Sequence, residues 1–328
     1  MKHLSDTKME IQRIDSSVYK NYFSNPYHIF NSVSFSELNK DKCNNLHYLL
    51  FKDSKVRFGI VLGERGECLC SPFSAPFGGF SFNKNEGVWY LEQAVTLLKG
   101  YGKSFNKQIR ISLPPTIYNP TIVSKSVSAF MREGAVVDYV DLNFQYEISH
   151  FVDYEKNIDR SARKNLHNSQ KIDFTFLQLD SNAEADVARA YNVIRQNREE
   201  RGFPLRMTLD MVLATIKIIP ADFFVCSLDG VDMAAAQVFH VSEDVYQVVY
   251  WGDIPQYAKL RVMNFFTYKI FEHYYHRGIR ILDIGPSTEK GIPNYGLCDF
   301  KENIGCSVSM KYTCLLYTSP SPRDVEES

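Results

Sequence analysis

The sequence predicts an α/β protein with mixed sheets, arranged as two domains in tandem. The chain has 328 residues, and one domain per about 150 residues gives two. The predicted elements also repeat, because three strands, a helix and a strand occupy residues 47–113 and the same order returns in residues 222–284. A helix between two strands favours a parallel crossover, whereas the meandering strands before it pair antiparallel, so both sheets should be mixed.

Composition and charge describe a folded protein without a general attraction to nucleic acid or membranes. Apolar residues make up 45% of the chain and charged residues 23%, as in soluble globular proteins. The net charge is −1, so contact with an anionic partner would need a local patch. The polar N-terminus lacks the apolar centre of a signal peptide, and no apolar run reaches the roughly 18–20 residues of a membrane span. A cytoplasmic location is therefore expected.

Cysteine and histidine spacing predicts neither a disulfide framework nor a metal site. The seven cysteines are an odd number and contain no CxxC pair, and Cys68 and Cys70 have the spacing of thiols on one strand face. His273 and His276 lie three residues apart on a predicted helix, but no third metal ligand is near them in the sequence. No metal cofactor is expected.

The first half is predicted to be a β-meander followed by alternating helices and strands. Residues 1–40 should form short helices and loops, and Asn119 followed by Pro120 is a strong helix start that Gly134 ends. The segment 71–82, SPFSAPFGGFSF, contains four phenylalanines that require either burial or a ligand. The expected elements are strands 47–51, 56–62 and 67–71, a helix over 88–99, a strand over 108–113, the Asn119 helix and a strand over 135–148.

The second half repeats strands and helices with clear end signals. Gly202 should end one helix, Thr208 or Asp210 should start the next, and Gly278 should end a third. The first helix of this half carries a cationic stripe at helical spacing, which is usually just a solvated face. The expected elements are helices 153–171, 183–201, one ending before Pro220 and 259–277, with strands 173–179, 222–228, 233–241, 245–251 and 279–284; the stripe consists of Arg160, Lys164, His167 and Lys171.

Residues 282–305 are the strongest candidate for a functional loop. They begin in a predicted strand, contain several glycines and prolines that interrupt regular structure, and close on Phe300 and Lys301. A long irregular loop between core elements often carries function, although a surface crossover with an ordinary surface lysine has the same composition.

A second candidate site is the turn WGDIP, residues 251–255, before the helix predicted from Lys259. The N-terminus of a helix offers unpaired N–H groups and a partial positive charge, which together attract phosphate. Asp253, Tyr257 and Lys259 would line such a site and bind the donor cofactor. A plain turn without a ligand is the alternative.

Four motifs of the second half occur in an order that is typical of one family. RSARKNLHNSQK resembles the R-x-N-I/L helix of the Fem-type peptidoglycan-bridge aminoacyltransferases and of related acetyltransferase-like proteins of the GNAT superfamily. NREERGF resembles their R-D/E-G-F helix end, DGVDMAAAQVF their paired strands, and LDIGPST with GLCDFKENIG their closing D-F/I-G-x-S and F-K-x-x-F/I-G signature. The likeness covers about residues 150–313, and the first half only loosely through residues 71–80.

The resemblance implies tandem GNAT-like domains with a cleft between them. Residues 1–149 would be a degenerate domain on the acceptor side, and residues 150–313 the motif-bearing domain on the donor side. The family moves an acyl or aminoacyl group from acyl-CoA or aminoacyl-tRNA onto an amine, which here would be a small molecule or a cell-wall precursor. The long helical hairpin for tRNA and the Q/R-x-x-G-x-G/A pyrophosphate motif are both missing, so the donor stays open.

The family motifs also imply roles for single residues. Arg163 matches an arginine that grips a phosphate of the acceptor or donor, and Lys301 matches the lysine placed near the reacting carbonyl. A fixed cation in a dry cleft would stabilise the oxyanion of the attack, and Asp283 or a water would take the proton of the amine. The other residues expected to bind substrate are Asn165, Arg201, Tyr250, Gly285 and Ser287.

Two further expectations concern a rival function and the C-terminus. A non-catalytic GNAT-fold module that binds a nucleotide-sugar or a protein partner would tolerate the loss of Lys301 and Asp283. Residues 314–324, CLLYTSPSPRD, look like a translated transposase adaptor from a sequencing library. Residues 314–328 are therefore predicted to be a non-native tail that adds nothing to the packing.

Overall fold

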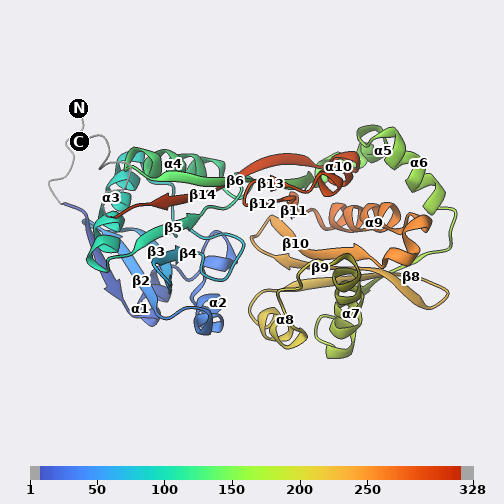
Figure 1. The fold of residues 1–328 in the computed structure, drawn as a ribbon, viewed down its shortest axis with the longest axis horizontal. Helices are drawn as coiled ribbons and strands as arrows, with labels where there is room; N and C mark the ends of the chain where they lie inside the picture. Colours follow the sequence, from blue (N-terminus) through green and yellow to red (C-terminus); the bar gives the residue numbers. More distant parts are fainter. Residues whose placement is uncertain (1–7, 319–328) are drawn as a thin grey trace. The chain divides into compact units, whose positions relative to one another are not determined.

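A computed structural model describes residues 8–318, which form two compact units with α/β architecture (Figure 1). Unit 1 contains the chain up to Asp141 and again from Met310, and unit 2 consists of Leu142–Ser309. The chain leaves unit 1 inside strand β6 (Val136–Glu147) and returns inside strand β14 (Ser307–Leu316). The expected division after residue 149 assigned the whole of this first strand to the N-terminal domain, whereas the two units share it.

Unit 1 contains a mixed sheet with the strand order β1-β2-β3-β4-β5-β14. All neighbours pair antiparallel except β4 and β5, which are parallel because helix α3 crosses over between them. The predicted meander and crossover are confirmed, whereas β1 lies in a segment expected to hold only helices and loops. The elements are β1 (Glu10–Ile14), β2 (Leu46–Lys52), β3 (Val56–Arg65), β4 (Cys68–Ser71), α3 (Val88–Ser104) and β5 (Gln108–Ser112).

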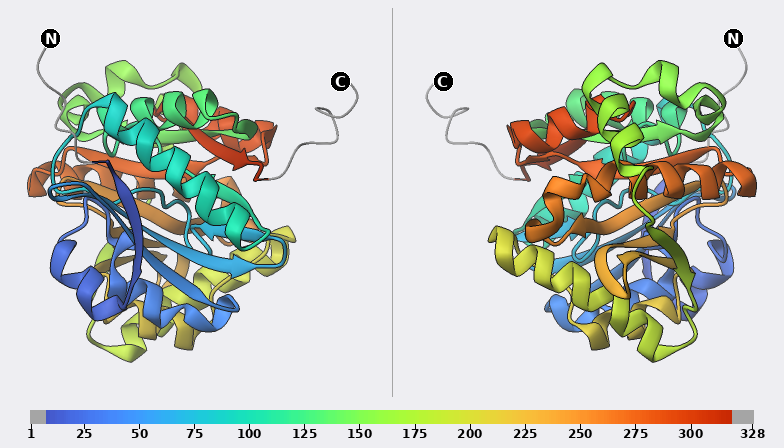
Figure 2. Two further views of the ribbon diagram at one scale, coloured as in Figure 1. Left: turned by 90° about the vertical axis from the view of Figure 1, so that its left-hand side faces the viewer. Right: turned by 90° about the vertical axis from the view of Figure 1, so that its right-hand side faces the viewer.

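Both faces of the unit 1 sheet are covered, so alternate residues of a strand enter different cores. In β2, Leu49 and Phe51 pack against α3 and α4 (Pro120–Arg132), whereas Tyr48 and Leu50 pack against α1 (Ser16–Tyr22). Figure 2 shows α3 lying across the strands. Asn119 caps α4 by accepting a hydrogen bond from the Ile122 N–H, 3.0 Å long, as the sequence predicts.

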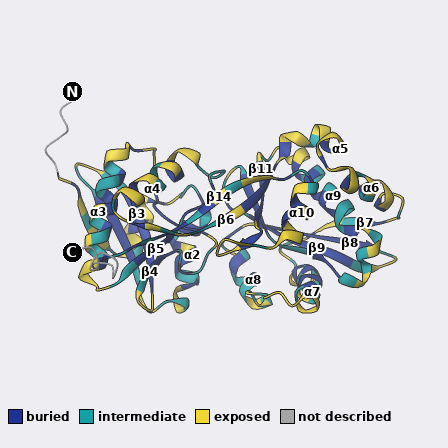
Figure 3. Cartoon of the chain, turned by 45° about the horizontal axis from the view of Figure 1, so that its top comes forward, coloured by how far each residue is buried: buried dark blue, intermediate teal, exposed yellow. Residues whose placement is uncertain are grey.

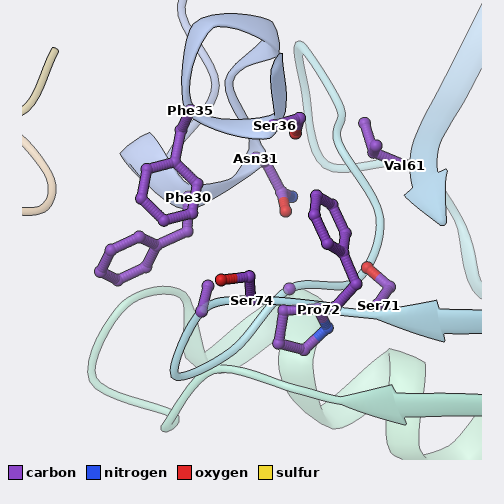
Figure 4. Close-up of a pocket in the computed structure, with 11 residues that line it drawn as sticks. Phe30, Asn31, Phe35, Ser36, Val61, Ser71, Pro72 and Ser74 are labelled. Carbon is purple, nitrogen blue, oxygen red and sulfur yellow. The ribbon is translucent and has the colours of Figure 1, made fainter. Parts of the chain in front are cut away.

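Three phenylalanines of residues 71–82 are part of these cores, and Phe77 packs against the rings of His28, Phe30 and Tyr118. Phe73, Phe77, Phe80 and Phe82 are all buried, so burial accounts for their clustering. A small pocket lies beside this segment, under α2 (Val33–Leu38), and has room for about one water molecule (Figure 4). It is lined by Phe30, Asn31, Phe35, Ser36, Val61, Ser71, Pro72, Phe73, Ser74, Ala75 and Gly78, none of which was predicted to be a site residue.

Strand β14 continues past Thr313, so the expectation that packing ends there is wrong. Cys314 pairs with Ile111 and Leu316 with Ile109, and both side chains are fully buried in the core under α3 and α4. The Thr318 hydroxyl donates to the Lys107 carbonyl over 2.9 Å. The remainder of the predicted tail, residues 319–328, lies outside the described residues.

Deletion of residues 314–328 is therefore expected to destabilise the protein. The loss of buried Leu316 alone should cost about 2–5 kcal/mol, because large-to-small changes in a core do so, and the melting temperature should fall by several degrees. A thermal melt of the truncated chain measures this. A control truncated after Thr318 separates the contribution of residues 314–318 from that of the rest, and equal melts for all three chains would contradict the packing of β14.

The strands of unit 2 follow the order β6-β11-β10-β9-β8-β7 and are again mixed in direction. All neighbours are antiparallel except β10 and β11, which are parallel and joined by helix α9. Helix α7 covers one face, and α9 covers the other with α6 packed beside it (Figure 1). The elements are α6 (Arg160–Ser169), β7 (Thr175–Leu179), α7 (Glu184–Arg201), α8 (Leu209–Ile216), β8 (Ala221–Leu228), β9 (Val231–His240), β10 (Val245–Asp253), α9 (Val262–Arg277) and β11 (Ile281–Pro286).

The helix ends of unit 2 follow their sequence signals. Gly202 and Gly278 adopt positive φ angles of 68° and 71° directly after α7 and α9, and Thr208 accepts a hydrogen bond from Met211 to cap α8. The inner face of α9 fills the core with Phe266, Phe271 and Tyr274, none of which is exposed. In Figure 3 the central strands of unit 2, β8 to β11, are largely buried, and the outward faces of the helices are exposed.

Three predicted elements of unit 2 are wrong in their extent. The helix over 153–171 is two helices, because Ile158 is extended and Asp159 caps a new start at α6. The helix expected from Lys259 begins at Val262, after a 3₁₀ turn η4 (Pro255–Leu260) and Arg261 with φ 57°. The supposed irregular loop forms a hairpin of β12 (Thr288–Glu289) and β13 (Ile292–Pro293), then helix α10 (Tyr295–Asn303), which Asn294 caps.

Candidate functional site

The parallel strands β10 and β11 separate from each other halfway along their length. Their ladder covers three residue pairs, from Val245 and Ile281 to Gln247 and Asp283. Beyond these, β10 stays paired with β9 to Asp253, and β11 stays paired with β6 to Pro286. Each strand has a bulge where the separation begins, and a bulge bends a strand away from its neighbour. The inner edge of β10 beyond residue 247 can therefore pair with an extended ligand.

Asp283 lies at the point where the two strands separate. Its side chain is fully buried and accepts hydrogen bonds from Asn143 Nδ2 at 2.7 Å, Gln247 Nε2 at 2.8 Å and the Gly285 N–H at 2.9 Å. These bonds link β6, β10 and β11 through one carboxylate. A carboxylate bound by groups on three strands is placed to hold those strands in position.

Lys301 is buried, although a surface lysine was one expectation. It projects from α10, and Nζ donates to the carbonyl oxygens of Ile284 at 3.1 Å, Gly285 at 2.8 Å and Pro286 at 3.3 Å. Successive carbonyls of a regular strand point to opposite sides. Here three in a row converge on one ammonium, because the strand bulges and Gly285 has a φ of 76°, which favours glycine.

The ammonium of Lys301 is a fixed positive charge beside the separated strands. Burial lowers its pKa to about 8, against a partial opposing effect of nearby Asp283, so the cation still predominates at neutral pH. The ring of Phe144 lies 5.2 Å below it. All three N–H groups of the ammonium already donate to carbonyl oxygens, so Lys301 would act on a ligand through its charge. A direct hydrogen bond to a ligand would have to replace one of these bonds, of which the one to Pro286 is the longest.

The end of β10 does not present Asp253 to a ligand. The Asp253 carboxylate pairs with Arg201 over 2.7 Å, and its backbone carbonyl accepts a hydrogen bond from Asn197 Nδ2 over 2.6 Å. Asp253, predicted to bind the donor cofactor, and Arg201, predicted to bind substrate, therefore bind each other. Their ion pair connects α7 to β10. Gly252 is needed here, because an added Cβ would lie 2.6 Å from Asn197.

The N-terminus of α9 keeps the features that favour phosphate. No side chain caps this helix, which begins after Arg261 in a left-handed conformation. Lys259 and Arg261 are exposed beside it, and Tyr257 is half-buried. The predicted Tyr257 and Lys259 thus lie next to uncapped N–H groups that can bind an anion.

Tyr250 lies beside an arginine that sequence reasoning missed. Its hydroxyl accepts a hydrogen bond from the Arg206 N–H over 3.3 Å, and the guanidinium of Arg198 lies 5.2 Å from its ring centre. Burial lowers the pKa of Arg198, and the charge of Arg198 makes a small contribution to the lowered pKa of Lys301. Arg198 belongs to the motif NREERGF, from which only Arg201 was predicted to be a site residue.

The remaining predicted residues are not joined to this cluster by any hydrogen bond or ion pair among residues 8–318. Arg163 is half-buried on α6, and its guanidinium donates to the Ile158 carbonyl over 3.3 Å. Asn165 is half-buried on the same helix. Ser287 is buried, and its N–H and carbonyl hold Leu142 and Asn294 while its hydroxyl has no partner. The cationic stripe of α6 is exposed.

The described part of the chain contains neither a metal-binding cluster nor a helix that could span a membrane. Residues 8–318 contain no group of three or more histidine, cysteine, aspartate or glutamate side chains that could hold a metal ion. Within the same residues, no helix has both the length and the apolar character needed to cross a bilayer.

Residues 153–302 match the family described as acetyltransferase (GNAT) domain. Among curated proteins, no sequence matches this chain significantly. Similar solved structures include FemX, with a TM-score of 0.67, 12% identity and coverage of 94% of this chain and 98% of FemX. L-PGS from Bacillus licheniformis has a TM-score of 0.60 and 11% identity, with coverage of 99% of this chain and 96% of L-PGS. A tandem GNAT protein from the clavulanic acid biosynthesis pathway has a TM-score of 0.52 and 6% identity, with coverage of 95% of this chain and 99% of that protein.

Residues 153–302 therefore resemble a GNAT domain, and the whole chain has the tandem GNAT-like fold. The resemblance to the GNAT superfamily that four short motifs predicted is confirmed by the family match, and the chain shares its fold with FemX.

Proposed function

We propose that the chain is an N-acyltransferase that moves an acyl or aminoacyl group from a thioester or ester donor to an amine. The observation that carries this proposal is the separation of β10 and β11 beside the buried ammonium of Lys301. The strand edge offers backbone groups to an extended donor, and the cation lies next to the place where the donor carbonyl would be.

The reaction would proceed by attack of the amine on the donor carbonyl. A C–N bond forms, the carbonyl oxygen becomes an oxyanion, and the C–S or C–O bond then breaks as the oxyanion collapses. The charge of Lys301 would stabilise the oxyanion without reorganising, because three carbonyls already hold it in place. A water would carry the proton from the amine to the leaving group, and Asp283 would hold β6, β10 and β11 in position.

The donor is proposed to be acyl-CoA or aminoacyl-tRNA, both of which carry phosphates. The uncapped N-terminus of α9 with Lys259, Arg261 and Tyr257 is the proposed phosphate site. Arg163 and Asn165 on α6 are proposed to contact a phosphate of the acceptor or donor. The acceptor would be a small-molecule amine or a cell-wall precursor, which would be met in the cytoplasm.

The proposal is tested by measuring transfer from acetyl-CoA, longer acyl-CoAs and aminoacyl-tRNA to a panel of amines. Release of the free CoA thiol, or of deacylated tRNA, in step with the acylated amine supports it. Absence of turnover with every donor that stabilises the protein in a thermal melt would contradict it.

The satisfied ammonium of Lys301 favours a second candidate, a non-catalytic GNAT-fold module that binds a nucleotide-sugar or a protein partner. A module of this kind would bind a phosphate-bearing ligand and release no leaving group. Calorimetric binding of a UDP-linked wall precursor without turnover of any donor distinguishes it from the enzyme.

A further inference from the structure

Arg198 is a partly buried cation without a counter-ion. Its Nε is enclosed and has no hydrogen-bond partner, and no carboxylate among residues 8–318 forms an ion pair with it. Other arginines of the same helix are paired: Arg189 with Asp232, Arg195 with Glu199 and Arg201 with Asp253. A desolvated charge without a partner costs free energy, so a protein that keeps one generally uses it.

The surroundings of Arg198 hold the guanidinium in a fixed position. The rings of Tyr250 and Phe203 lie 5.2 Å and 5.9 Å from it. A guanidinium that contacts rings in this way can still donate hydrogen bonds through the edge of its plane. Tyr250 belongs to the part of β10 that has separated from β11. The guanidinium of Arg198 therefore lies beside this part of β10, where an anionic group of a ligand would be attracted by its charge.

We infer that Arg198 binds an oxyanion group of the substrate, a phosphate or a carboxylate, at the separation of β10 and β11. The inference rests on the proposed function and adds to it that one substrate carries a negative group close to the transferred acyl group. The edge of a guanidinium can donate two parallel N–H bonds to either anion, which a lysine in its place would not do.

The experiment compares melting temperatures of the full chain in sodium phosphate, sodium acetate and sodium chloride at equal ionic strength. Wild type should melt about 2 °C higher in phosphate or in acetate than in chloride. Arg198→Met should lose this difference, Arg198→Lys should keep a smaller part of it, and the matched control Arg195→Gln should keep all of it. A response to phosphate alone identifies a phosphate-bearing substrate, and a response to acetate alone a carboxylate.

Arg198→Met should also melt at or above the wild-type temperature in chloride, because it removes an unpaired charge and keeps the apolar stem. A much lower melting temperature would show that Arg198 serves the fold, and would overturn the inference. Equal responses of wild type and Arg198→Met to all three salts would overturn it as well. Because no turnover is measured, a chain that transfers acyl groups without this anion response keeps the proposed function and loses only the inference.

Discussion

Replacing Lys301 with methionine is expected to abolish acyl transfer almost completely and to destabilise the protein. Loss of one oxyanion-stabilising group costs about a hundredfold to a thousandfold in turnover. The substitution also leaves three buried carbonyls without a donor, which should lower the free energy of unfolding by about 3–5 kcal/mol. Methionine keeps most of the volume of the lysine stem, so this loss comes from the hydrogen bonds and not from packing.

The measurement is steady-state kinetics beside a thermal melt, at a temperature where the Lys301→Met chain is folded. Glu302→Gln is the matched control, because Glu302 is the exposed neighbour on the same helix and should change neither value. More than half of the wild-type turnover in a folded Lys301→Met chain would remove Lys301 from the mechanism and favour the binding module.

The second large effect is expected from Asp283→Ala. It leaves the side-chain amides of Asn143 and Gln247 and the N–H of Gly285 without an acceptor in a fully buried place. Each unsatisfied donor costs about 1–3 kcal/mol, so the free energy of unfolding should fall by at least about 3 kcal/mol. Denaturant unfolding measures this change.

Asp283→Asn separates a positioning role from that of a general base. The amide keeps one acceptor oxygen, so this variant should be more stable than Asp283→Ala and should keep part of its turnover with an unchanged pH profile. Loss of a general base costs about a hundredfold to ten-thousandfold and removes its limb of the profile. That result in a folded Asp283→Asn chain would assign proton transfer to Asp283.

Elements with local signals could be predicted from the sequence. Asn119 and Pro120 start α4, and Gly202 and Gly278 end α7 and α9, because a cap or a positive φ depends on few neighbours. The order of strand, helix and strand in each unit followed from hydrophobic periodicity. The family relation followed from motifs that keep their order along the chain.

The remainder depends on contacts between distant residues. The return of β14 to unit 1 and the separation of β10 from β11 are pairings that no local pattern encodes. Lys301 looked exposed because its three acceptors, which allow its burial, lie 15–17 residues before it. Helix α10 was missed because the glycines and prolines before it outweighed the cap at Asn294.

The central claim is that the donor occupies the separation of β10 and β11, and amide hydrogen exchange with and without acetyl-CoA or another bound donor tests it most directly. The account predicts that the donor slows exchange in residues 248–252, on the β10 edge that lacks a partner strand, and at the start of α9. Helix α4 of unit 1 serves as the control, and its amides should exchange equally in both samples. A donor that binds and leaves residues 248–252 unprotected would contradict the account.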